Sequence, residues 1–448
     1  MPMRTTLLAT IRSQLSNQDA LGTLILRGVL AASELVCALV IARVFKASGY
    51  GVYALVLAWA GLLGIPAAAG FDRLLIREIA VQRARDEWAL ARGLLNRSRT
   101  LVLVCSLVVA GGVATLAPRV AAGAPRETIT AFQIGLLTVP LIAYGRVRQA
   151  ALQGLGRVVA AQIPEALVQP LVLLTLAGAL HFAPEVARTG VLAVTLYTLS
   201  AAAACTAGIV ILSKSLPDSI RTATPAYRTG EWLRSAAPFV ALLGFNVVMT
   251  SADTVLVGFL VGATDAGVYR LASQAAMLIS FPLTCVNMAV APRLAALYAR
   301  SDNVGLQSEV RDAARTVLLL TLPVVVALGL AAPFLLRLFG PEFERAYPPL
   351  LVLCAGQLVN VAMGTSGYLL LMTRHEGNVA VIFAAFAVLD VLGALVLIPA
   401  WGILGAAVST ALSFALMSGT MAILARRRLG IRATLFALNT RARETRNV

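Results

Sequence analysis

Residues 39–57 read LVIARVFKASGYGVYALVL, and residues 253–271 read DTVLVGFLVGATDAGVYRL. A shift of 216 residues, which carries position 51 to position 267, superposes Gly51-Val52-Tyr53 on Gly267-Val268-Tyr269. The same shift superposes Leu55 on Leu271, Pro66 on Pro282 and Arg77 on Arg293. Matches at Gly, Tyr, Pro and Arg are not explained by apolar composition, so the sequence predicts two duplicated halves.

The composition around these stretches is that of a membrane protein. Of the 448 residues, 59% are hydrophobic and 13% are charged, whereas soluble domains carry about 25% charged residues. The apolar residues form runs of about 18 or more, unlike the short alternating segments of a membrane β-barrel. We therefore predict an all-α polytopic membrane protein, and an ordinary water-soluble enzyme is excluded.

Breaking the apolar runs at Gly, Pro and charge clusters predicts about twelve transmembrane helices. They lie near 21–45, 50–70, 99–118, 127–147, 158–181, 189–213, 235–261, 266–290, 315–339, 347–372, 378–399 and 403–425. We expect a cytoplasmic interfacial segment at 1–20, six-helix bundles at 21–213 and 235–425, a cytoplasmic linker at 214–234 and a basic cytoplasmic tail at 426–448. Because each bundle has an even number of spans, the repeat is parallel, with its pseudo-two-fold axis along the membrane normal.

The charges indicate orientation rather than a nucleic-acid partner. With both termini in the cytoplasm, about three quarters of the 37 Lys and Arg lie on the cytoplasmic side, as the positive-inside rule requires. The net charge of +16 then faces the anionic inner leaflet. The five Cys form no CxxC pair and there are two His, so we expect no metal site, no cofactor and no catalytic residue.

The duplicated positions have structural interpretations. Gly51 and Gly267 are typical either of close helix approach or of a tight outer turn between the first two spans of each half. Pro66 and Pro282 remove a backbone hydrogen bond late in the matching helices, which predicts a kink or a hinge.

Several stretches together resemble the polysaccharide transporter family, the Wzx-type flippases of lipid-linked oligosaccharides in the MOP exporter superfamily. They are residues 39–57, GFDRLLIREIA at 70–80, residues 253–271, LFGPEF at 338–343 and IPAWGILGAAVSTALS at 398–413. The resemblance implies a MOP-type fold in a bacterial inner (plasma) membrane, and we expect no enzymatic activity. It also implies flipping of an undecaprenyl-diphosphate-linked oligosaccharide from the cytoplasmic to the periplasmic leaflet by alternating access. The product would feed surface polysaccharide synthesis (O-antigen, capsule or exopolysaccharide), with membrane lipids and polymerase machinery as partners.

A diphosphate substrate needs cationic groups within the membrane, and four arginines are candidates. Arg27 lies about two turns into the first span, and Arg270 lies just inside the eighth span from the outer side. Arg146 and Arg148, at the cytoplasmic end of the fourth span, are placed to meet the diphosphate on entry. Snorkelling to the interface and topology signalling are the structural alternatives for these residues.

Four acids and two amides are candidates for ion coupling or for lining a cavity. The acids are Glu34, Glu165, Asp253 and Asp390, and the amides are Gln162 and Gln169, at helical spacing from Glu165. Intramembrane carboxylates are expensive and usually functional, here through proton or sodium coupling or through hydrogen bonds to sugar. A structural ion pair with Arg27 or Arg270 is the alternative for each acid.

Two other functions fit parts of the pattern. A MATE-like cation or drug antiporter shares the duplicated twelve-helix plan and favours an acidic cavity. A membrane glycosyltransferase or polymerase would need a catalytic loop, whereas the predicted outer loops are short and the cytoplasmic ones lack a DxD pair.

Overall fold

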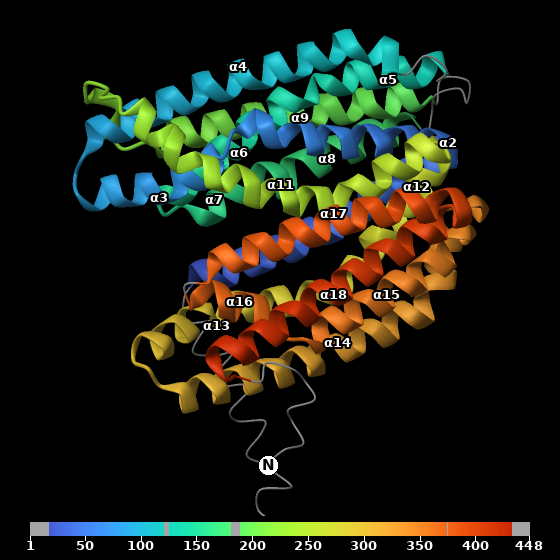
Figure 1. The fold of residues 1–448 in the computed structure, drawn as a ribbon. Helices are drawn as coiled ribbons and strands as arrows, with labels where there is room; N and C mark the ends of the chain where they lie inside the picture. The colour runs from blue at the N-terminus through green and yellow to red at the C-terminus, as the bar shows by residue number, and fades with distance from the viewer. Residues whose placement is uncertain (1–17, 121–124, 181–188, 374, 432–448) are drawn as a thin grey trace, which may run out of the picture. The chain divides into compact units, whose positions relative to one another are not determined.

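The computed structural model describes residues 18–120, 125–180, 189–373 and 375–431. The secondary structure of these residues is helical, with no strand among them (Figure 1). Two compact units divide the chain, Met1–Val247 (unit 1) and Val248–Val448 (unit 2). Their boundary falls inside helix α11 (Thr229–Leu260).

Unit 1 consists of helices that pack around α2. In chain order they are α2 (Gln18–Ala68), α3 (Phe71–Ala84), α4 (Trp88–Val120), α5 (Arg126–Leu136), α6 (Thr138–Gly154), α7 (Val158–Ile163), the π-helix η1 (Pro164–Val168), α8 (Gln169–Ala179), α9 (Gly190–Ser215) and α10 (Asp218–Thr222). Helix α2 packs against α4, α6, α8 and α9, and α9 also packs against α5, α6 and α8. Because α2, α4 and α9 are apolar over most of their length, they bury one side in the unit and leave the other for lipid.

Helix α2 is two membrane spans joined by a sharp break. Its segment Gly28–Ala68 has 41 residues, which would extend about 60 Å as one helix against a hydrocarbon core of ~30 Å. The break is at Lys46, with φ 57° and ψ −178°, inside an otherwise helical run. In unit 2 the corresponding position is Gly262, with φ 139°, between α11 and α12. The turn therefore lies five residues before Gly51 and Gly267, which are buried inside helices, so helix approach is the interpretation that fits these two glycines.

Unit 2 begins with the second part of α11. The helices that follow are α12 (Ala263–Met277), the 3₁₀-helix η4 (Leu278–Ser280), α13 (Phe281–Ala299), α14 (Asn303–Phe339), the 3₁₀-helix η5 (Pro341–Ala346), α15 (Tyr347–Ala362), α16 (Ser366–Met372), α17 (Glu376–Trp401) and α18 (Ile403–Leu429). Helix α18 packs along α17 and α15, and α12 packs against α15. Pro282 follows the 3₁₀ turn that separates α12 from α13, which is the break that the proline predicted.

The spans agree with a polytopic membrane protein. Among the described residues eight helical segments are long and apolar enough to cross a bilayer, and the bent pair Pro341–Ala362 and Ser366–Met372 makes nine. These eight count the broken helix α2 once. The protein is therefore an all-α, multi-pass membrane protein, and the order of its helices accommodates the predicted twelve crossings.

The connection that follows α9 is fastened to unit 1. The Ala226 amide donates to the Ala89 carbonyl at 2.9 Å, and the Arg92 guanidinium donates to the Ala223 carbonyl at 2.6 Å. Gly93 of α4 lets the backbone of Ala226 pass close by. A methyl group at position 93 would overlap the Ala226 carbonyl. Trp232, near the start of α11, is 4% exposed and belongs to the hydrophobic core that α2, α3, α4 and α6 form in unit 1. The connection thus lies on the surface of unit 1 as an ordered segment.

Candidate functional site

A buried hydrogen-bonded cluster joins three helices of unit 2. Asp253 of α11 is 3% exposed, and its Oδ2 accepts from the Thr410 hydroxyl of α18 at 2.6 Å. The same oxygen accepts from the Tyr269 hydroxyl of α12 at 3.1 Å, and the Tyr269 and Thr410 oxygens lie 2.8 Å apart. Asp253 Oδ1 is buried with no hydrogen-bond partner among the described residues. A buried carboxylate oxygen without a donor is costly, and a proton, a water or an ion can satisfy it.

A second acid, Asp390 of α17, lies beside this cluster. It is 0% exposed, and it is near enough to Asp253 for the two carboxyl groups to interact electrostatically. The Ser409 hydroxyl of α18 donates to the backbone carbonyl of Asp390 at 2.8 Å. Ser409 and Ser413 lie near the carboxyl group, but neither of its oxygens is in hydrogen-bonding geometry with a described residue. No described Arg or Lys forms an ion pair with either acid.

These groups can hold a small hard cation or share protons. Two carboxylates and several hydroxyls offer the oxygen ligands that such ions prefer, and two neighbouring acids disfavour being ionised together. The cluster has only two carboxylates, and among the described residues there is no group of three or more His, Cys, Asp and Glu of the kind that holds a metal ion. We call Asp253, Tyr269, Asp390 and Thr410 the acidic cluster.

The acidic cluster occupies a position that is different in the other half. By the 216-residue shift Asp253 corresponds to Cys37, and Tyr269 corresponds to Tyr53. Cys37 and Tyr53 are both buried, and the Tyr53 ring packs edge-on against Tyr197, with centroids 5.7 Å apart. The duplicated scaffold therefore carries this carboxylate in unit 2 and a thiol at the same place in unit 1.

Unit 1 has a buried ion pair of its own. Arg148 of α6 is 0% exposed, and its Nη2 donates to Oε1 of Glu165 in the π-helix η1. The Glu165 side chain is 31% exposed. Gly208 of α9 makes room for the arginine, because a methyl group there would overlap the guanidinium. Glu165 thus has a basic partner, as the structural alternative predicted, but this partner is Arg148 rather than Arg27 or Arg270.

The π-helix that carries Glu165 interrupts the fifth predicted span. Pro164 begins the wide turn and Pro170 follows it, and short π segments of this kind are frequent at functional sites. Gln162 is buried, and its amide lies 3.4 Å from the Val158 carbonyl of its own helix. Gln169 is partly exposed. The structure therefore gives no contact that joins these two amides to Glu165.

The remaining predicted residues have surroundings of their own. Arg146 of α6 is partly buried near Gly64 of α2, and no described residue gives it a hydrogen bond or ion pair. The Arg270 guanidinium lies 3.4 Å from the Thr250 carbonyl, partly buried in unit 2. Glu34 is on the exposed side of α2. Arg27 belongs to α2, but its side chain is outside the described residues.

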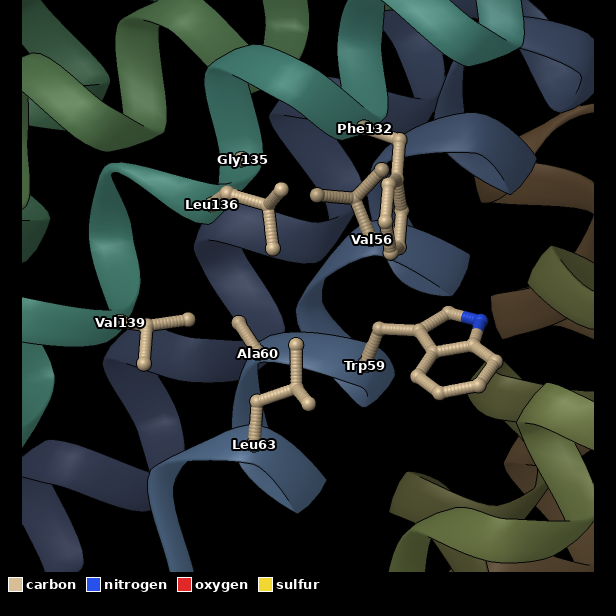
Figure 2. A pocket seen from close by; sticks show the side chains of 8 residues that line it. All are labelled: Val56, Trp59, Ala60, Leu63, Phe132, Gly135, Leu136 and Val139. Carbon is tan, nitrogen blue, oxygen red and sulfur yellow. The ribbon is translucent and has the colours of Figure 1, made fainter. Parts of the chain in front are cut away.

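An apolar slot lies between α2 and the α5–α6 pair of unit 1 (Figure 2). It is too narrow to hold a water molecule, and hydrocarbon and aromatic side chains line it almost entirely. Trp59 and Phe132 pack edge-on at one end of the slot, with ring centroids 5.9 Å apart. Gly135 lets Val56 approach the α5 backbone, since a methyl group there would overlap the valine. The slot adds no charged group to the candidate site.

Two known protein families match this chain over regions that include acids of the acidic cluster or the Arg148–Glu165 ion pair. Residues 20–298 match the sequence profile of the family described as polysaccharide biosynthesis protein, and residues 238–396 match the MatE profile. The first match covers more than half of the chain. The chain belongs to the polysaccharide biosynthesis protein family. Arg148 and Glu165 fall inside the matched region of this family, as do Asp253 and Tyr269.

A curated relative supports the family membership over a shorter stretch. This polysaccharide biosynthesis protein is 32% identical over 142 residues to the uncharacterized membrane protein EpsK of Bacillus subtilis (strain 168). The matched stretch covers 32% of this chain and 27% of EpsK, so it spans about a quarter of that relative.

Solved structures establish the fold of this polysaccharide biosynthesis protein. An inward-facing multidrug resistance MATE family transporter of the MOP superfamily matches with a TM-score of 0.75 and 13% identity, over 90% of this chain and 94% of that one. The lipid II flippase MurJ, in an inward closed conformation, matches with a TM-score of 0.70 and 12% identity, over 90% and 87%. The predicted MOP-type fold is confirmed, and the structural relatives are transporters.

The sequence located the acids but not their neighbours. Tyr269 and Thr410 are the residues that it missed in the acidic cluster, although both stand in stretches that carry the family resemblance. Gly208 was also missed, and its only signal is a small residue in an apolar helix. None of these residue types is unusual in a membrane span, so composition alone could not single them out.

Proposed function

We propose that this polysaccharide biosynthesis protein is a flippase for an undecaprenyl-diphosphate-linked oligosaccharide. It moves the lipid-linked sugar from the cytoplasmic to the periplasmic leaflet by alternating access, ahead of assembly into O-antigen, capsule or exopolysaccharide. The observation that carries the proposal is the match to the polysaccharide biosynthesis family over residues 20–298. The MOP-type fold, which MurJ and MATE transporters share, supports movement of a solute across the membrane.

The arginines of α6 support an anionic substrate. Arg148 is fully buried inside a membrane-spanning unit, and Arg146 is partly buried without a partner among the described residues. A guanidinium within a bilayer costs about 3 kcal/mol or more on insertion scales, so it is retained where it meets an anion or lines a hydrated space. A diphosphate provides the oxygens that a guanidinium binds best.

Coupling to an ion gradient is assigned to Asp253 and Asp390 within this proposal. Both carboxyl groups are buried, each has an oxygen without a donor, and no described basic residue neutralises them. Glu34 and Glu165 are less suited, because Glu34 is exposed and Glu165 is paired with Arg148. A proton or a sodium ion bound at the acidic cluster would neutralise charge that is otherwise expensive at this depth.

A MATE-like cation or drug antiporter is the second candidate function. Its support is the MatE match over residues 238–396, which includes both acids of the cluster. In that case an organic cation, rather than a lipid-linked anion, would be the cargo. Dependence of transport on the arginines separates the two functions, because a cation carrier gains nothing from Arg146 and Arg148.

The test is accumulation and movement of the lipid-linked sugar. Cells that lack the protein should accumulate the undecaprenyl-diphosphate-linked oligosaccharide on the cytoplasmic leaflet, and the wild-type protein should restore its arrival in the periplasmic leaflet. Vesicles that contain only the purified protein should flip the same lipid. If the lipid is flipped at the normal rate without the protein while efflux of an organic cation is lost, the antiporter is correct.

The same proposal places the protein in a bacterial inner membrane with both termini cytoplasmic. The basic excess of the inner connections and tail supports this orientation. Reporter fusions after Arg228 and after Val448 test it, because a reporter that is active only in the periplasm should be silent at both. The proposed partners are membrane lipids and the polymerase that extends the flipped glycan.

A further inference from the structure

The buried ion pair of unit 1 uses only part of its arginine. Arg148 Nη2 donates to Glu165, while Nε and Nη1 are buried with no hydrogen-bond partner among the described residues. Buried N–H groups on a charged side chain are costly when they are unpaired. Glu165 Oε2 likewise has no partner there. The pair is therefore held by one hydrogen bond where a guanidinium and a carboxylate can form two.

Exposure differs sharply between the two partners. The Arg148 side chain is 0% exposed and that of Glu165 is 31% exposed. Glu165 is thus the more exposed partner, although its Oε2 is buried, and its Oε1 accepts the one hydrogen bond from Nη2. On another face Arg148 lies against the α9 backbone at Gly208, which leaves no room for a side chain. The arginine is fixed by packing, and the more exposed partner is the carboxylate side chain.

The segment that carries Glu165 differs from an ordinary helix. It is a π-helix of five residues, Pro164–Val168, between α7 and α8. A π turn holds an extra residue relative to an α turn, and such turns are conformationally special points in membrane helices. Gly145 of α6 lies beside this carboxylate. A methyl group at position 145 would lie 3.4 Å from Oε1 of Glu165, so the glycine leaves space there. The carboxylate therefore has both an irregular backbone and a small neighbour beside it.

We propose that Glu165 is an internal substitute for the substrate's diphosphate at Arg148. In the empty carrier the carboxylate neutralises the buried guanidinium, and an arriving diphosphate displaces it. A diphosphate brings more oxygens than a carboxylate, so it can also accept from Nη1, whereas Nε lies against Gly208. The displaced Glu165 returns when the substrate leaves. This inference rests on the proposed function, and it adds a displaceable anion to the substrate-binding candidate Arg148.

Binding of inorganic pyrophosphate to the purified full-length protein in lipid nanodiscs tests the displacement. Glu165→Gln should bind pyrophosphate about tenfold or more tightly than the wild type, because an amide competes less well than a carboxylate for the guanidinium. Glu127→Gln is the matched control. Glu127 lies in the same unit, accepts from the Gly190 amide at 2.7 Å and contacts no described arginine, so its replacement should leave the affinity at the wild-type value.

A second substitution assigns the gain to Arg148. In the double variant Glu165→Gln with Arg148→Gln the gain in affinity should vanish, whereas in Glu165→Gln with Arg146→Gln it should persist. Unchanged affinity in Glu165→Gln, or a gain that survives loss of Arg148, would overturn the proposal.

A measurement on the unmodified protein keeps the inference testable if the variants do not fold. Saturating pyrophosphate should increase modification of Glu165 by a membrane-permeable carbodiimide several-fold, since a displaced carboxylate leaves its ion pair, while modification of Glu127 stays constant. Protection of Glu165, or an unchanged rate, contradicts displacement. If pyrophosphate behaves as expected but no lipid-linked sugar is flipped, the site stands and the proposed function fails. If flipping is intact in Arg148→Gln, the function stands and the site fails.

Discussion

The break in α2 at Lys46 gives a sharp test of how the duplicated halves differ. Its φ of 57° and ψ of −178° lie in a region of backbone space that is almost restricted to glycine. A residue with a Cβ held in such a region costs about 1–3 kcal/mol. The corresponding turn in unit 2 has Gly262 at φ 139°, where no Cβ is present. Unit 1 therefore stores strain at a turn where unit 2 stores none.

Lys46→Gly should relieve this strain at little other cost. The side chain is exposed, with no hydrogen bond or ion pair to a described residue, so few contacts are lost. Glycine adds about 0.5–1 kcal/mol of backbone entropy to the unfolded chain. The net gain in the free energy of unfolding is therefore about 1 kcal/mol, and at most about 2.5 kcal/mol.

Unfolding of the purified protein in increasing dodecyl sulfate, followed by tryptophan fluorescence, measures this gain. Trp59, Trp88 and Trp232 lie in unit 1 and report on it. Lys46→Ala is the matched control, because it removes the same side chain but keeps the Cβ, and it should leave the stability unchanged. Gly262→Ala should destabilise unit 2. A stability of Lys46→Gly equal to that of Lys46→Ala would refute the assignment of strain.

Three further outcomes follow from the packing. Asp253→Asn and Asp390→Asn should each abolish the dependence of flipping on an ion gradient while the protein remains folded. The measurement is flipping in vesicles with and without an imposed gradient. Gradient dependence retained in both variants would remove the acidic cluster from coupling. Arg148→Ala should lower the free energy of unfolding by about 3–5 kcal/mol, because Glu165 is left unpaired, and the double replacement Arg148→Met with Glu165→Leu should recover most of that loss; a double variant as unstable as the single one would contradict this. Gly93→Ala should detach the connection at Ala226, since the new methyl group overlaps the Ala226 carbonyl. Faster proteolysis between residues 223 and 228 would report the detachment. An unchanged cleavage rate would show that the connection tolerates the methyl group.

The duplicated fold was predictable because its signals are residues that apolar composition does not supply. Tyr53 and Tyr269, Pro66 and Pro282 recur at one spacing, and each pair falls in matching helices of the two halves. The exact position of the turn between the first two spans was not predictable. In unit 1 it uses Lys46, a residue type that has no preference for positive φ, so the nearby Gly51 was the better candidate from sequence alone.

The partners of the buried charges were less accessible to sequence reasoning. Positive-inside arguments explain Arg148 as a topology signal, because the residue stands close to the predicted cytoplasmic end of its span. Its pairing with Glu165 depends on how α6, η1 and α9 pack, and on the space that Gly208 leaves. Asp253 and Asp390 are separated by more than a hundred residues, so α18 had to be placed between their helices before the two acids could be recognised as one cluster.

The exchange of Asp253 for Cys37 at duplicated positions has an evolutionary consequence. After a gene duplicates within one reading frame, each copy of the scaffold is free to acquire mutations that the other does not share. Here one copy has come to enclose a guanidinium with its carboxylate, and the other has come to enclose two acids among hydroxyls. Selection can then alter the buried groups of one copy without altering those of the other, since a substitution in either leaves its paralogous counterpart intact.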